Sequence, residues 1–291
     1  MGLCDIHVIK DVLGRHGFRF SKTLGQNFLT AQWVPDRIAA ECGAGPDSAV
    51  LEIGPGMGCL TYALSKTAGK VVAVELDRAL FPVLEETLAE CKNVEVVHGD
   101  VLKTDLAALC RAHFGQTPVY ACANLPYYIT TPAIAALLDS HAFQGITVMV
   151  QKEVAKRICA PVGSSASGAF TVYVQYRAAA RILFDVPAGC FIPQPKVDSA
   201  VLQLTPLAAP AVQVQDEALF FSIVRAAFQQ RRKTLANALS AAFCGRLDKA
   251  QILTLITSCG LDARVRGEQL SLAEFGRLAD AAHARLTGSS L

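Results

Sequence analysis

Residues 49–66 restrict the fold of this chain more than any other stretch. Residues 49–53, Ala-Val-Leu-Glu-Ile, have the nearly continuous apolar character of a strand buried in a parallel sheet. A glycine-rich run, 54–58, follows the strand, and residues 60–66 have the pattern of a helix. Strand, glycine-rich turn and helix in this order are typical of nucleotide-binding α/β folds, because glycines let the backbone approach a ligand closely. We therefore expect an α/β fold with a mostly parallel sheet.

Three later apolar runs also lead into a polar residue. Residues 71–74 lead to Glu75, which lies 21 positions after Gly54 and is placed to bind both hydroxyls of a ribose. Residues 94–97 lead to Asp100, which could accept a hydrogen bond from an adenine amine or cap a helix. Open α/β sheets bind ligands at the carboxyl ends of their strands, so we expect these side chains to meet at one site.

The fourth such strand, 119–123, leads to Asn124-Leu125-Pro126-Tyr127. The asparagine offers an acceptor oxygen and a donor amide. The proline removes one backbone donor, so that the carbonyl of Leu125 or of Pro126 could face a ligand. The tyrosine adds an aromatic face, and Phe191 could add a second one or belong to the core. This tetrapeptide could hold a planar amine with two acceptors and a ring to stack on.

Composition excludes several classes of protein. No apolar run approaches the roughly 20 residues of a membrane helix. The N-terminus lacks the basic-then-apolar order of a signal peptide, so we expect a cytoplasmic protein without membrane association. The ten cysteines include no Cys-x-x-Cys pair, which favours small buried hydrophobic residues over a metal site or disulfides. We therefore predict no metal.

Charge is unevenly distributed along the chain. Residues 1–30 carry four Lys or Arg against two Asp or Glu, residues 31–215 thirteen against sixteen, and residues 216–291 ten against seven. Basic ends are compatible with an anionic partner held at the margins of the protein. The candidate phosphate contacts, which could equally be solvated helix surface, are Lys152, Lys156, Arg157, Arg231, Arg232 and Lys233.

The rest of the chain suggests two domains, residues 1–208 and a small helical domain, 209–291. The segment 18–29, with Gln26 and Asn27, is either a surface arm or a loop that folds over a ligand. The further predicted helices are one that begins at residue 5 and ends at Gly14 or Gly17, 32–42, 78–91, 131–138, one that begins near residue 151, and three C-terminal helices, 216–243, 247–258 and 271–286. The further predicted strands are 146–150, 170–178 and 199–204, and 163–168 has the composition of a flexible linker.

The glycine spacing distinguishes between nucleotides. An NAD-type fingerprint, Gly-x-Gly-x-x-Gly, would need glycine at Cys59, whereas the chain has Gly54, Gly56 and Gly58. Glu-x-Gly-x-Gly-x-Gly after a strand resembles the pattern of Rossmann-like methyltransferases that use S-adenosylmethionine. The tetrapeptide at Asn124 resembles the Asn/Asp-Pro-Pro-Tyr motif of enzymes that methylate exocyclic amines.

Five motifs that occur in a fixed order restrict the resemblance to one family of methyltransferases. From about residue 18 to the C-terminus the chain resembles the small-subunit ribosomal RNA adenine dimethyltransferases, the KsgA/RsmA family. Tyr128 departs from the pattern, because some relatives carry asparagine there. The motifs are Leu-Gly-Gln-Asn-Phe-Leu at 24–29, Glu-Ile-Gly-Pro-Gly at 52–56, the tetrapeptide at 124–127, Phe-Ile-Pro-Gln-Pro-Lys-Val-Asp at 191–198 and Gln-Arg-Arg-Lys-Thr-Leu at 230–235.

The resemblance implies a seven-stranded, mostly parallel Rossmann-like sheet with an antiparallel edge, plus a small all-α C-terminal domain. It implies an enzyme that acts as a monomer and uses S-adenosylmethionine, releasing S-adenosylhomocysteine. The substrate would be 16S rRNA or a small-subunit precursor. Two adjacent adenosines in its 3′-terminal hairpin loop would each become N6,N6-dimethyladenosine. The residues that match the cofactor contacts of the family are Asn27, Leu29, Gly54, Glu75, Asp100 and Asn124.

Three alternatives differ from this interpretation. An antibiotic-resistance methyltransferase acting on 23S rRNA would share fold, cofactor and tetrapeptide, but residues 195–201 and 230–235 argue against it. A non-catalytic RNA-binding assembly factor would keep the fold without the intact cofactor motifs. An NAD-dependent dehydrogenase is disfavoured by Cys59 and by the lack of a motif-supported acid/base histidine.

Overall fold

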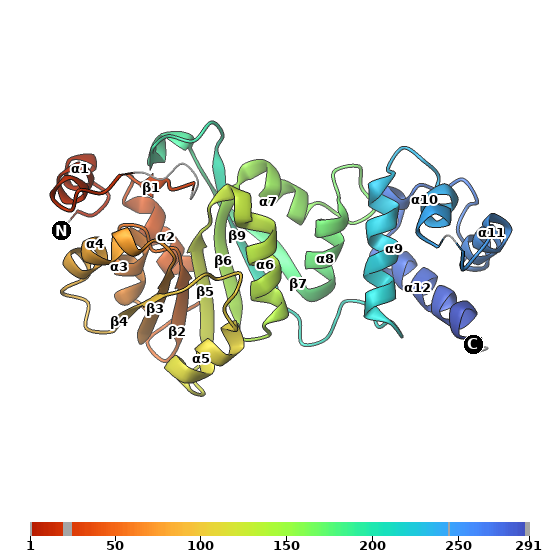
Figure 1. Ribbon diagram of the computed structural model, residues 1–291, viewed down its shortest axis with the longest axis horizontal. Coiled ribbons are helices and arrows are strands. Elements are labelled where there is room, and N and C mark those ends of the chain that lie inside the picture. Colours follow the sequence, from red (N-terminus) through yellow and green to blue (C-terminus); the bar gives the residue numbers. More distant parts are fainter. Residues whose placement is uncertain (1, 20–24, 244, 289–291) are drawn as a thin grey trace. The chain divides into compact units, whose positions relative to one another are not determined.

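The computed structural model describes residues 2–19, 25–243 and 245–288 (Figure 1). Contacts divide the chain into two compact units, residues 1–156 with 179–206, and residues 157–178 with 207–291. Each unit has a hydrophobic core of its own. Within the described ranges, no helix is both long and apolar enough to cross a membrane.

The first unit is built on a seven-stranded sheet with the order β4-β3-β2-β5-β6-β9-β7 (Figure 1). β2 to β6 run parallel, and β9 runs antiparallel to β6. This confirms the predicted mostly parallel sheet of seven strands with an antiparallel strand toward one edge. The strands are β2 (Ala49–Ile53), β3 (Lys70–Glu75), β4 (Val94–His98), β5 (Val119–Asn124), β6 (Gly145–Gln151), β7 (Ala178–Val186) and β9 (Ser199–Pro206).

The central strands are apolar because they are buried. Every residue of β2 is buried, and so is every residue of β6 except Gln151. β2 pairs in parallel with both neighbours, and Leu51 lies opposite Val72 of β3 and Ala121 of β5. This register brings the carboxyl ends of the strands to the same edge of the sheet, which is where the predicted site residues begin.

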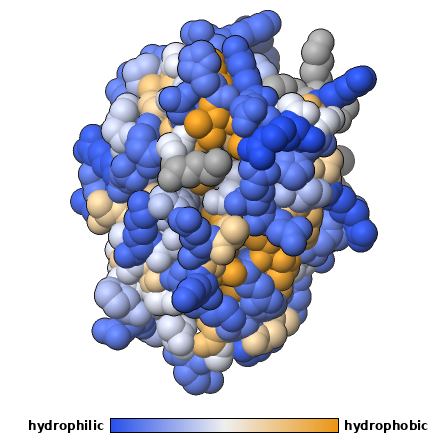
Figure 2. Space-filling model, turned by 90° about the vertical axis from the view of Figure 1, so that its left-hand side faces the viewer, coloured by the Kyte–Doolittle hydropathy of each residue, from blue (hydrophilic) through white to orange (hydrophobic). Residues whose placement is uncertain are grey.

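Helices α1 to α4 share one core with the sheet, to which the strands contribute residues such as Val50, Cys122 and Val201. Figure 1 shows α6 alongside β5 and β6. The side of this unit where α1 and α4 lie has a mostly hydrophilic surface with small apolar areas (Figure 2). The helices are α1 (Ile6–Arg15), α2 (Trp33–Glu41), α3 (Cys59–Ser65), η1 (Arg78–Leu80), α4 (Phe81–Thr87), α5 (Leu106–Phe114), η2 (Tyr127–Ile129), α6 (Thr130–Asp139), η3 (Ala188–Cys190) and α7 (Lys152–Cys159), of which residues 157–159 are assigned to the second unit.

A second, two-stranded sheet ties the N-terminal arm to a late segment of the chain. β1 (Phe28–Leu29) pairs antiparallel with β8 (Phe191–Ile192), and Leu29 lies opposite Phe191. Thr30 N donates a hydrogen bond to the Cys190 carbonyl at 2.8 Å. Two motifs more than 160 residues apart in the sequence are therefore adjacent in the fold.

The second unit is helical. Its core contains an aromatic group in which Tyr176 packs against Phe220 and Phe221, with ring centroids 4.9 and 5.2 Å away. Phe220 and Phe275 are fully buried. The helices are α8 (Ala169–Arg177), α9 (Glu217–Gln229), α10 (Leu235–Ala242), α11 (Lys249–Ser258), η4 (Gly267–Gln269) and α12 (Leu272–Thr287).

The predicted strand 170–178 is wrong, because these residues form α8 and the next strand, β7, begins only at Ala178. The segment is rich in β-branched and aromatic residues, which favour strands when taken alone. Val172 and Tyr176, four residues apart, are buried together in the core of the second unit. Tertiary packing on one helix face therefore outweighs the local preference.

The predicted flexible linker, residues 163–168, is an ordered turn. Ser167 is fully buried, and its backbone N donates to the Ser164 carbonyl at 3.0 Å. A Cβ placed on Gly163 would lie 3.2 Å from the Gln269 carbonyl, so the segment packs closely against another part of the second unit.

The long helix predicted over 216–243 is two helices, α9 and α10, with a turn between them. Gln230 ends α9, and the Lys233 backbone N donates to the Gln230 carbonyl at 2.8 Å. The described part of the C-terminal region thus has four α-helices where the sequence suggested three. The predicted boundary at 208/209 lies near Pro206, but the contacts also place residues 157–178 in the second unit.

Candidate active site

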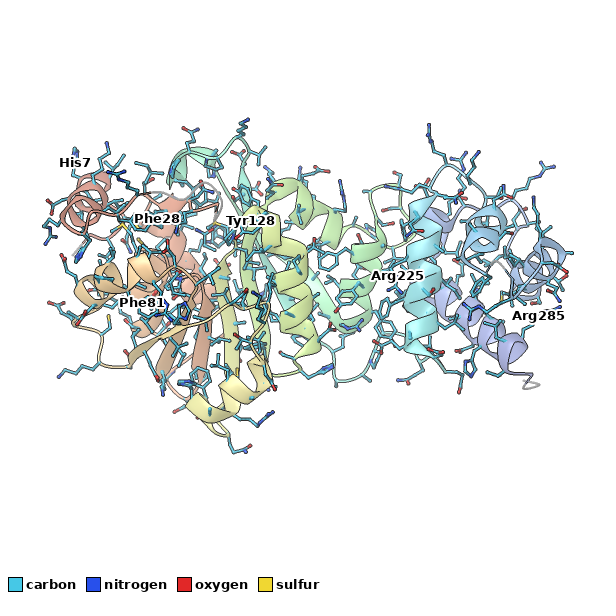
Figure 3. The ribbon with its side chains drawn as sticks, in the orientation of Figure 1. His7, Phe28, Phe81, Tyr128, Arg225 and Arg285 are labelled. Atoms are coloured by element: carbon cyan, nitrogen blue, oxygen red, sulfur yellow. The ribbon has the colours of Figure 1, made fainter. Side chains whose placement is uncertain are left out.

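One cavity at the carboxyl edge of the sheet brings together most of the predicted site residues. Figure 3 shows two of its lining residues, Phe28 and Tyr128, at this end of the sheet. It is lined by all ten residues predicted for cofactor binding, amine binding and base stacking: Asn27, Leu29, Gly54, Glu75, Asp100, Asn124, Leu125, Pro126, Tyr127 and Phe191. None of the six predicted phosphate contacts lines it.

The turn between β2 and α3 requires glycine. Gly54, Gly56 and Gly58 have φ values of 66°, 59° and 86°, in the left-handed region that favours glycine. An added Cβ would lie 3.1 Å from the Phe28 ring at Gly56 and 3.0 Å from Leu88 at Gly58, but would meet nothing within 4 Å at Gly54. The cavity wall at Gly54 therefore leaves room for a ligand to lie against the backbone.

Glu75 ends β3 and is buried at the cavity. Its Oε1 atom accepts a hydrogen bond from the backbone N of Asp77 at 2.7 Å. Burial raises the pKa of Glu75, and backbone N–H groups of Asp77, Leu76 and Gly56 oppose that rise. A carboxylate fixed in this way can accept two hydroxyl hydrogens, as a ribose diol requires.

Glu52 is a cavity residue that the sequence analysis did not assign to the site. It lies inside β2 with 1% exposure, and within the described ranges its Oε2 atom has no hydrogen-bond partner. Burial, with a smaller contribution from the charge of Glu75, raises its pKa to about 8, against the opposing effect of the Thr61 hydroxyl. An acidic residue in an otherwise apolar strand was the signal in the sequence. A buried carboxyl group on a cavity wall suits a cationic part of a ligand.

Asp100 follows β4 and lines the same cavity. Its Oδ1 atom accepts a hydrogen bond from the Leu102 backbone N at 3.0 Å. It therefore caps a turn and not a helix, because Asp105 is the N-cap of α5. Leu76 and Leu102, 44% and 42% exposed, stand at the cavity rim and present apolar surface suited to the flat face of a base. Neither leucine is among the residues predicted from the sequence.

The N-terminal arm orients the Asn124 side chain. Asn124 Nδ2 donates a hydrogen bond to the Asn27 carbonyl at 3.1 Å, which leaves Oδ1 as an acceptor. Gln26 also lines the cavity, and its Nε2 donates to Asp77 at 2.8 Å. Residues 20–24 of the arm lie outside the described residues, so closure of this loop over a ligand stays a prediction.

The backbone of the tetrapeptide offers one further acceptor. The Leu125 N–H donates to the Met149 carbonyl at 3.2 Å, and the Pro126 carbonyl accepts from the Ile129 N–H at 3.1 Å. Among the described residues, no backbone N–H donates to the Leu125 carbonyl. The sequence left the Leu125 and Pro126 carbonyls as alternatives, and the hydrogen bonding favours Leu125 as a partner for a ligand.

Aromatic side chains complete the site. Tyr127 is half-buried on η2, and its hydroxyl lies 2.8 Å from Ser199 Oγ. Phe191 is 5% exposed, belongs to the core and also reaches the cavity. Tyr128, 58% exposed, stands at the rim (Figure 3).

The predicted phosphate contacts lie outside the cavity and differ in their surroundings. In the first unit, Lys152 pairs with Asp185 at 2.7 Å, whereas Lys156 is exposed. In the second unit Arg157 is exposed on α7, and Arg231 donates to Glu268 at 2.8 Å and to the Ser165 carbonyl at 2.7 Å.

Basic side chains from two loops lie near the turn between α9 and α10, whereas the sequence indicated only those of the turn itself. Arg232 and Lys233 are exposed there. The Leu235 N–H donates to the Val265 carbonyl at 2.7 Å, which brings a second loop beside this turn. That loop carries two exposed arginines that the sequence analysis missed, Arg264 and Arg266. We call Arg232, Lys233, Arg264 and Arg266 the basic cluster.

Comparison with known proteins gives consistent results. The sequence model of the ribosomal RNA adenine dimethylase family matches residues 17–281. The chain is 46% identical over 277 residues to the ribosomal RNA small subunit methyltransferase A of Shouchella clausii, with 94% of each chain covered. It is 44% identical over 273 residues to the protein of the same name from Oceanobacillus iheyensis, with 93% of each covered.

Two solved structures share the fold. A dimethyladenosine transferase from Plasmodium falciparum has a TM-score of 0.73 at 24% identity, covering 86% of this chain and 95% of that one. The 23S rRNA methyltransferase ErmE has a TM-score of 0.66 at 25% identity, covering 89% of this chain and 99% of that one.

Proposed function

The chain belongs to the ribosomal RNA adenine dimethylase family, and on this premise we propose that it dimethylates 16S rRNA. It is an S-adenosylmethionine-dependent methyltransferase. The proposed substrates are two adjacent adenosines in the 3′-terminal hairpin loop, each converted to N6,N6-dimethyladenosine during assembly of the small subunit. The observation that carries the proposal is that the glycine turn, Glu75 and the Asn124 tetrapeptide line one cavity.

The residues of the cavity fit the cofactor. The open wall at Gly54 leaves room for it, and the Glu75 carboxylate is placed for its ribose hydroxyls. Asp100 would accept from its adenine amine, and the buried Glu52 carboxyl group suits its cationic end. When bound, S-adenosylmethionine supplies a methyl group activated by a sulfonium, so the protein need only present the nucleophile.

The tetrapeptide makes the adenine amine a better nucleophile. The nitrogen lone pair of this amine is delocalised into the ring, and the reaction requires a pyramidal nitrogen. Asn124 Oδ1 and the Leu125 carbonyl would accept its two hydrogens and hold it toward the cofactor side of the cavity. Correct positioning of two reactants can contribute about 7–11 kcal/mol. The proton can leave after the methyl group is transferred, when the nitrogen is cationic and acidic, so no dedicated general base is needed.

The target base must leave its stack to reach the cavity. This costs roughly a few kcal/mol, and less in a loop than in a duplex. Stacking on Tyr127, and on Phe191 where it reaches the cavity, would return about 1–3 kcal/mol per face.

Each unit offers its own contacts to the RNA backbone. Lys156 is exposed in the first unit, and the basic cluster is exposed in the second. Neutralising several phosphates makes binding fall steeply with salt concentration. Recognition by shape is expected, because the deep major groove of A-form RNA is closed to side chains.

The nearest alternative is methylation of 23S rRNA, which the fold shared with ErmE allows. The relatives at 44–46% identity, which cover nearly the whole chain, are small-subunit methyltransferases, and this favours 16S rRNA. Primer extension on both rRNAs, after incubation with protein and S-adenosylmethionine, decides between them. We expect stops at two adjacent adenosines near the 3′ end of 16S rRNA. A stop in 23S rRNA alone would overturn the proposal.

The second alternative is an RNA-binding factor without catalysis. Titration calorimetry with S-adenosylmethionine tests it, because the cavity described above should bind the cofactor stoichiometrically. Absence of binding would favour the non-catalytic factor.

A further inference from the structure

One hydrogen bond links the tetrapeptide to a strand that the proposed mechanism does not use. The Tyr127 hydroxyl lies 2.8 Å from Ser199 Oγ. Tyr127 is on η2, after β5, whereas Ser199 is the first residue of β9. Ser199 does not line the cavity, so it has no direct contact with a ligand there.

Ser199 is held in place on several sides. Its side chain is fully buried, and it lies opposite Gln151 in the antiparallel pair of β6 and β9. The preceding residue, Asp198, accepts the Lys152 backbone N–H at its carbonyl (3.0 Å) and the Ala188 N–H at its carboxylate (2.9 Å). The Ser199 hydroxyl is therefore a fixed point.

Tyr127 has less support of its own. It follows Pro126 in a single 3₁₀ turn, and its side chain is only half-buried. Burial raises the pKa of Tyr127, which keeps the phenol protonated and able to hydrogen-bond. The hydroxyl oxygen of a tyrosine lies on the axis of the terminal torsion, so a hydrogen bond there fixes the direction of the side chain and not the rotation of the ring about that axis. The bond to Ser199 therefore holds the Tyr127 ring at one position on the cavity wall.

We propose that Ser199 is a positioning residue that fixes the position of the Tyr127 ring, and through it the position of the target adenine. This inference rests on the proposed function. A base stacked on the ring takes its place from the ring, and its exocyclic amine moves with the base. The position at which the amine meets the methyl donor therefore depends on a hydroxyl outside the cavity.

The second methylation should depend on Ser199 more than the first. An unmethylated amine has two N–H groups, so Asn124 and the Leu125 carbonyl can orient it together. The monomethylated amine has one N–H left, so one of these acceptors loses its partner. Stacking then provides a larger share of the orientation, and a loose Tyr127 ring would do more harm.

The test follows the products of each step under single-turnover conditions, with N6-methyladenosine and N6,N6-dimethyladenosine quantified by mass spectrometry. Ser199→Ala and Tyr127→Phe remove the same hydrogen bond from opposite sides, so one variant remains informative if the other folds poorly. Loss of one neutral hydrogen bond corresponds to about a 3- to 10-fold change in rate. We expect that loss in the second step, a smaller one in the first, and accumulation of the monomethylated base.

A double-mutant cycle separates positioning from general stability. Ser199→Ala combined with Tyr127→Phe should be no slower than either single variant, because all three lack the same bond. The affinity for S-adenosylmethionine should stay unchanged. Thr147→Val is the matched control: Thr147 is a buried hydroxyl residue on β6 whose Oγ1 atom has no partner among the described residues. Its product ratio should match that of the wild type.

Two results would count against these conclusions in different ways. If the wild type forms dimethyladenosine and both single variants keep its ratio of mono- to dimethylated product, the positioning role is wrong and the bond is only structural. If the wild type forms no dimethyladenosine, the proposed function itself fails, and the role of Ser199 fails with it.

Discussion

Asn124 and Glu52 are polar side chains on the wall of one cavity, and their surroundings give them different tasks. The side-chain amide of Asn124 donates a hydrogen bond to the Asn27 carbonyl. This bond between two neutral groups fixes the direction of the Asn124 Oδ1 atom. Glu52 is a fully buried carboxyl group with a strongly raised pKa. The first side chain can orient an amine, and the second can balance a cation by releasing its proton when the cation binds.

Asn124→Ala should lower turnover at least about 100-fold without unfolding the protein, because it removes an acceptor aimed at the reacting nitrogen. Asn124→Asp keeps an oxygen but loses the donor to Asn27, so we expect intermediate activity. Single-turnover methyl transfer, with circular dichroism as the check on folding, measures both. Normal methylation by Asn124→Ala would show that the assigned role is wrong.

Glu52→Gln should change how stability depends on pH. Burial raises the pKa of Glu52 from 4.5 to about 8 in the folded protein. The folded state therefore holds the proton more tightly than the unfolded chain. The resulting stability is fully present below about pH 4.5 and is lost as pH rises through about 8.

Between pH 5 and 8.5 the wild type, without ligand, should lose a few kcal/mol of unfolding free energy relative to Glu52→Gln, at about 1.4 kcal/mol per unit of pKa shift. Denaturant unfolding at both pH values measures this. Glu90→Gln, an exposed carboxylate replaced in the same way, should follow the wild type. Parallel pH dependence of wild type and Glu52→Gln would contradict the burial argument.

At the scale of elements, the turn between α9 and α10 contains two kinds of arginine. Arg231 is engaged by Glu268 and the Ser165 carbonyl, so it supports the fold of the second unit. Arg232 and Lys233 are exposed and form the basic cluster with the nearby loop. The sequence run Arg-Arg-Lys does not distinguish these roles.

Arg232→Ala with Lys233→Ala should weaken RNA binding and reduce the slope of log affinity against log salt by about 2, because each removed cation leaves one phosphate without its partner. Filter binding over a series of salt concentrations gives the slope. Arg225→Ala, which removes an exposed arginine in the middle of α9 (Figure 3), is the control and should leave the slope closer to that of the wild type. If the double variant keeps the wild-type slope of log affinity against log salt, Arg232 and Lys233 do not contact phosphates and are solvated surface residues.

Helices and strands were predicted well where a single sequence pattern determines them. The strands β2, β3, β5 and β6 were predictable because burial on both faces leaves a continuous apolar run. α8 was not, because its strand-like composition is overridden by packing against Phe220 and Phe221, distant residues that no local window contains. The break after Gln230 was missed because the helical periodicity continues across a short turn.

The residues that line the cavity were predicted to a similar extent and for a related reason. Residues in glycine turns and at strand ends follow from local pattern, so Gly54, Glu75 and Asn124 could be found. Leu76 and Leu102 could not, because an ordinary leucine becomes informative only when the fold leaves it exposed at a cavity rim. Ser199 could not be predicted from the sequence, because its position depends on the pairing of β6 with β9.

At the scale of the whole molecule, two cores imply two partly independent stabilities. Phe220 is fully buried in the second unit, so Phe220→Ala should cost about 3–5 kcal/mol there. All residues proposed to bind the cofactor lie in the first unit, so cofactor binding should persist in this variant. Thermal unfolding followed with and without S-adenosylmethionine checks both statements. If Phe220→Ala loses cofactor binding at the same temperature as its first unfolding transition, the two cores are not independent.

The central claim is that one cavity carries an adenine amine through two methylations on small-subunit rRNA. Its most direct test is to incubate the protein and S-adenosylmethionine with unmethylated small-subunit RNA or particles and to analyse nuclease digests by mass spectrometry. We expect two adjacent adenosines to become N6,N6-dimethyladenosine. Methylation confined to large-subunit rRNA, or a product that stops at N6-methyladenosine, would contradict this claim.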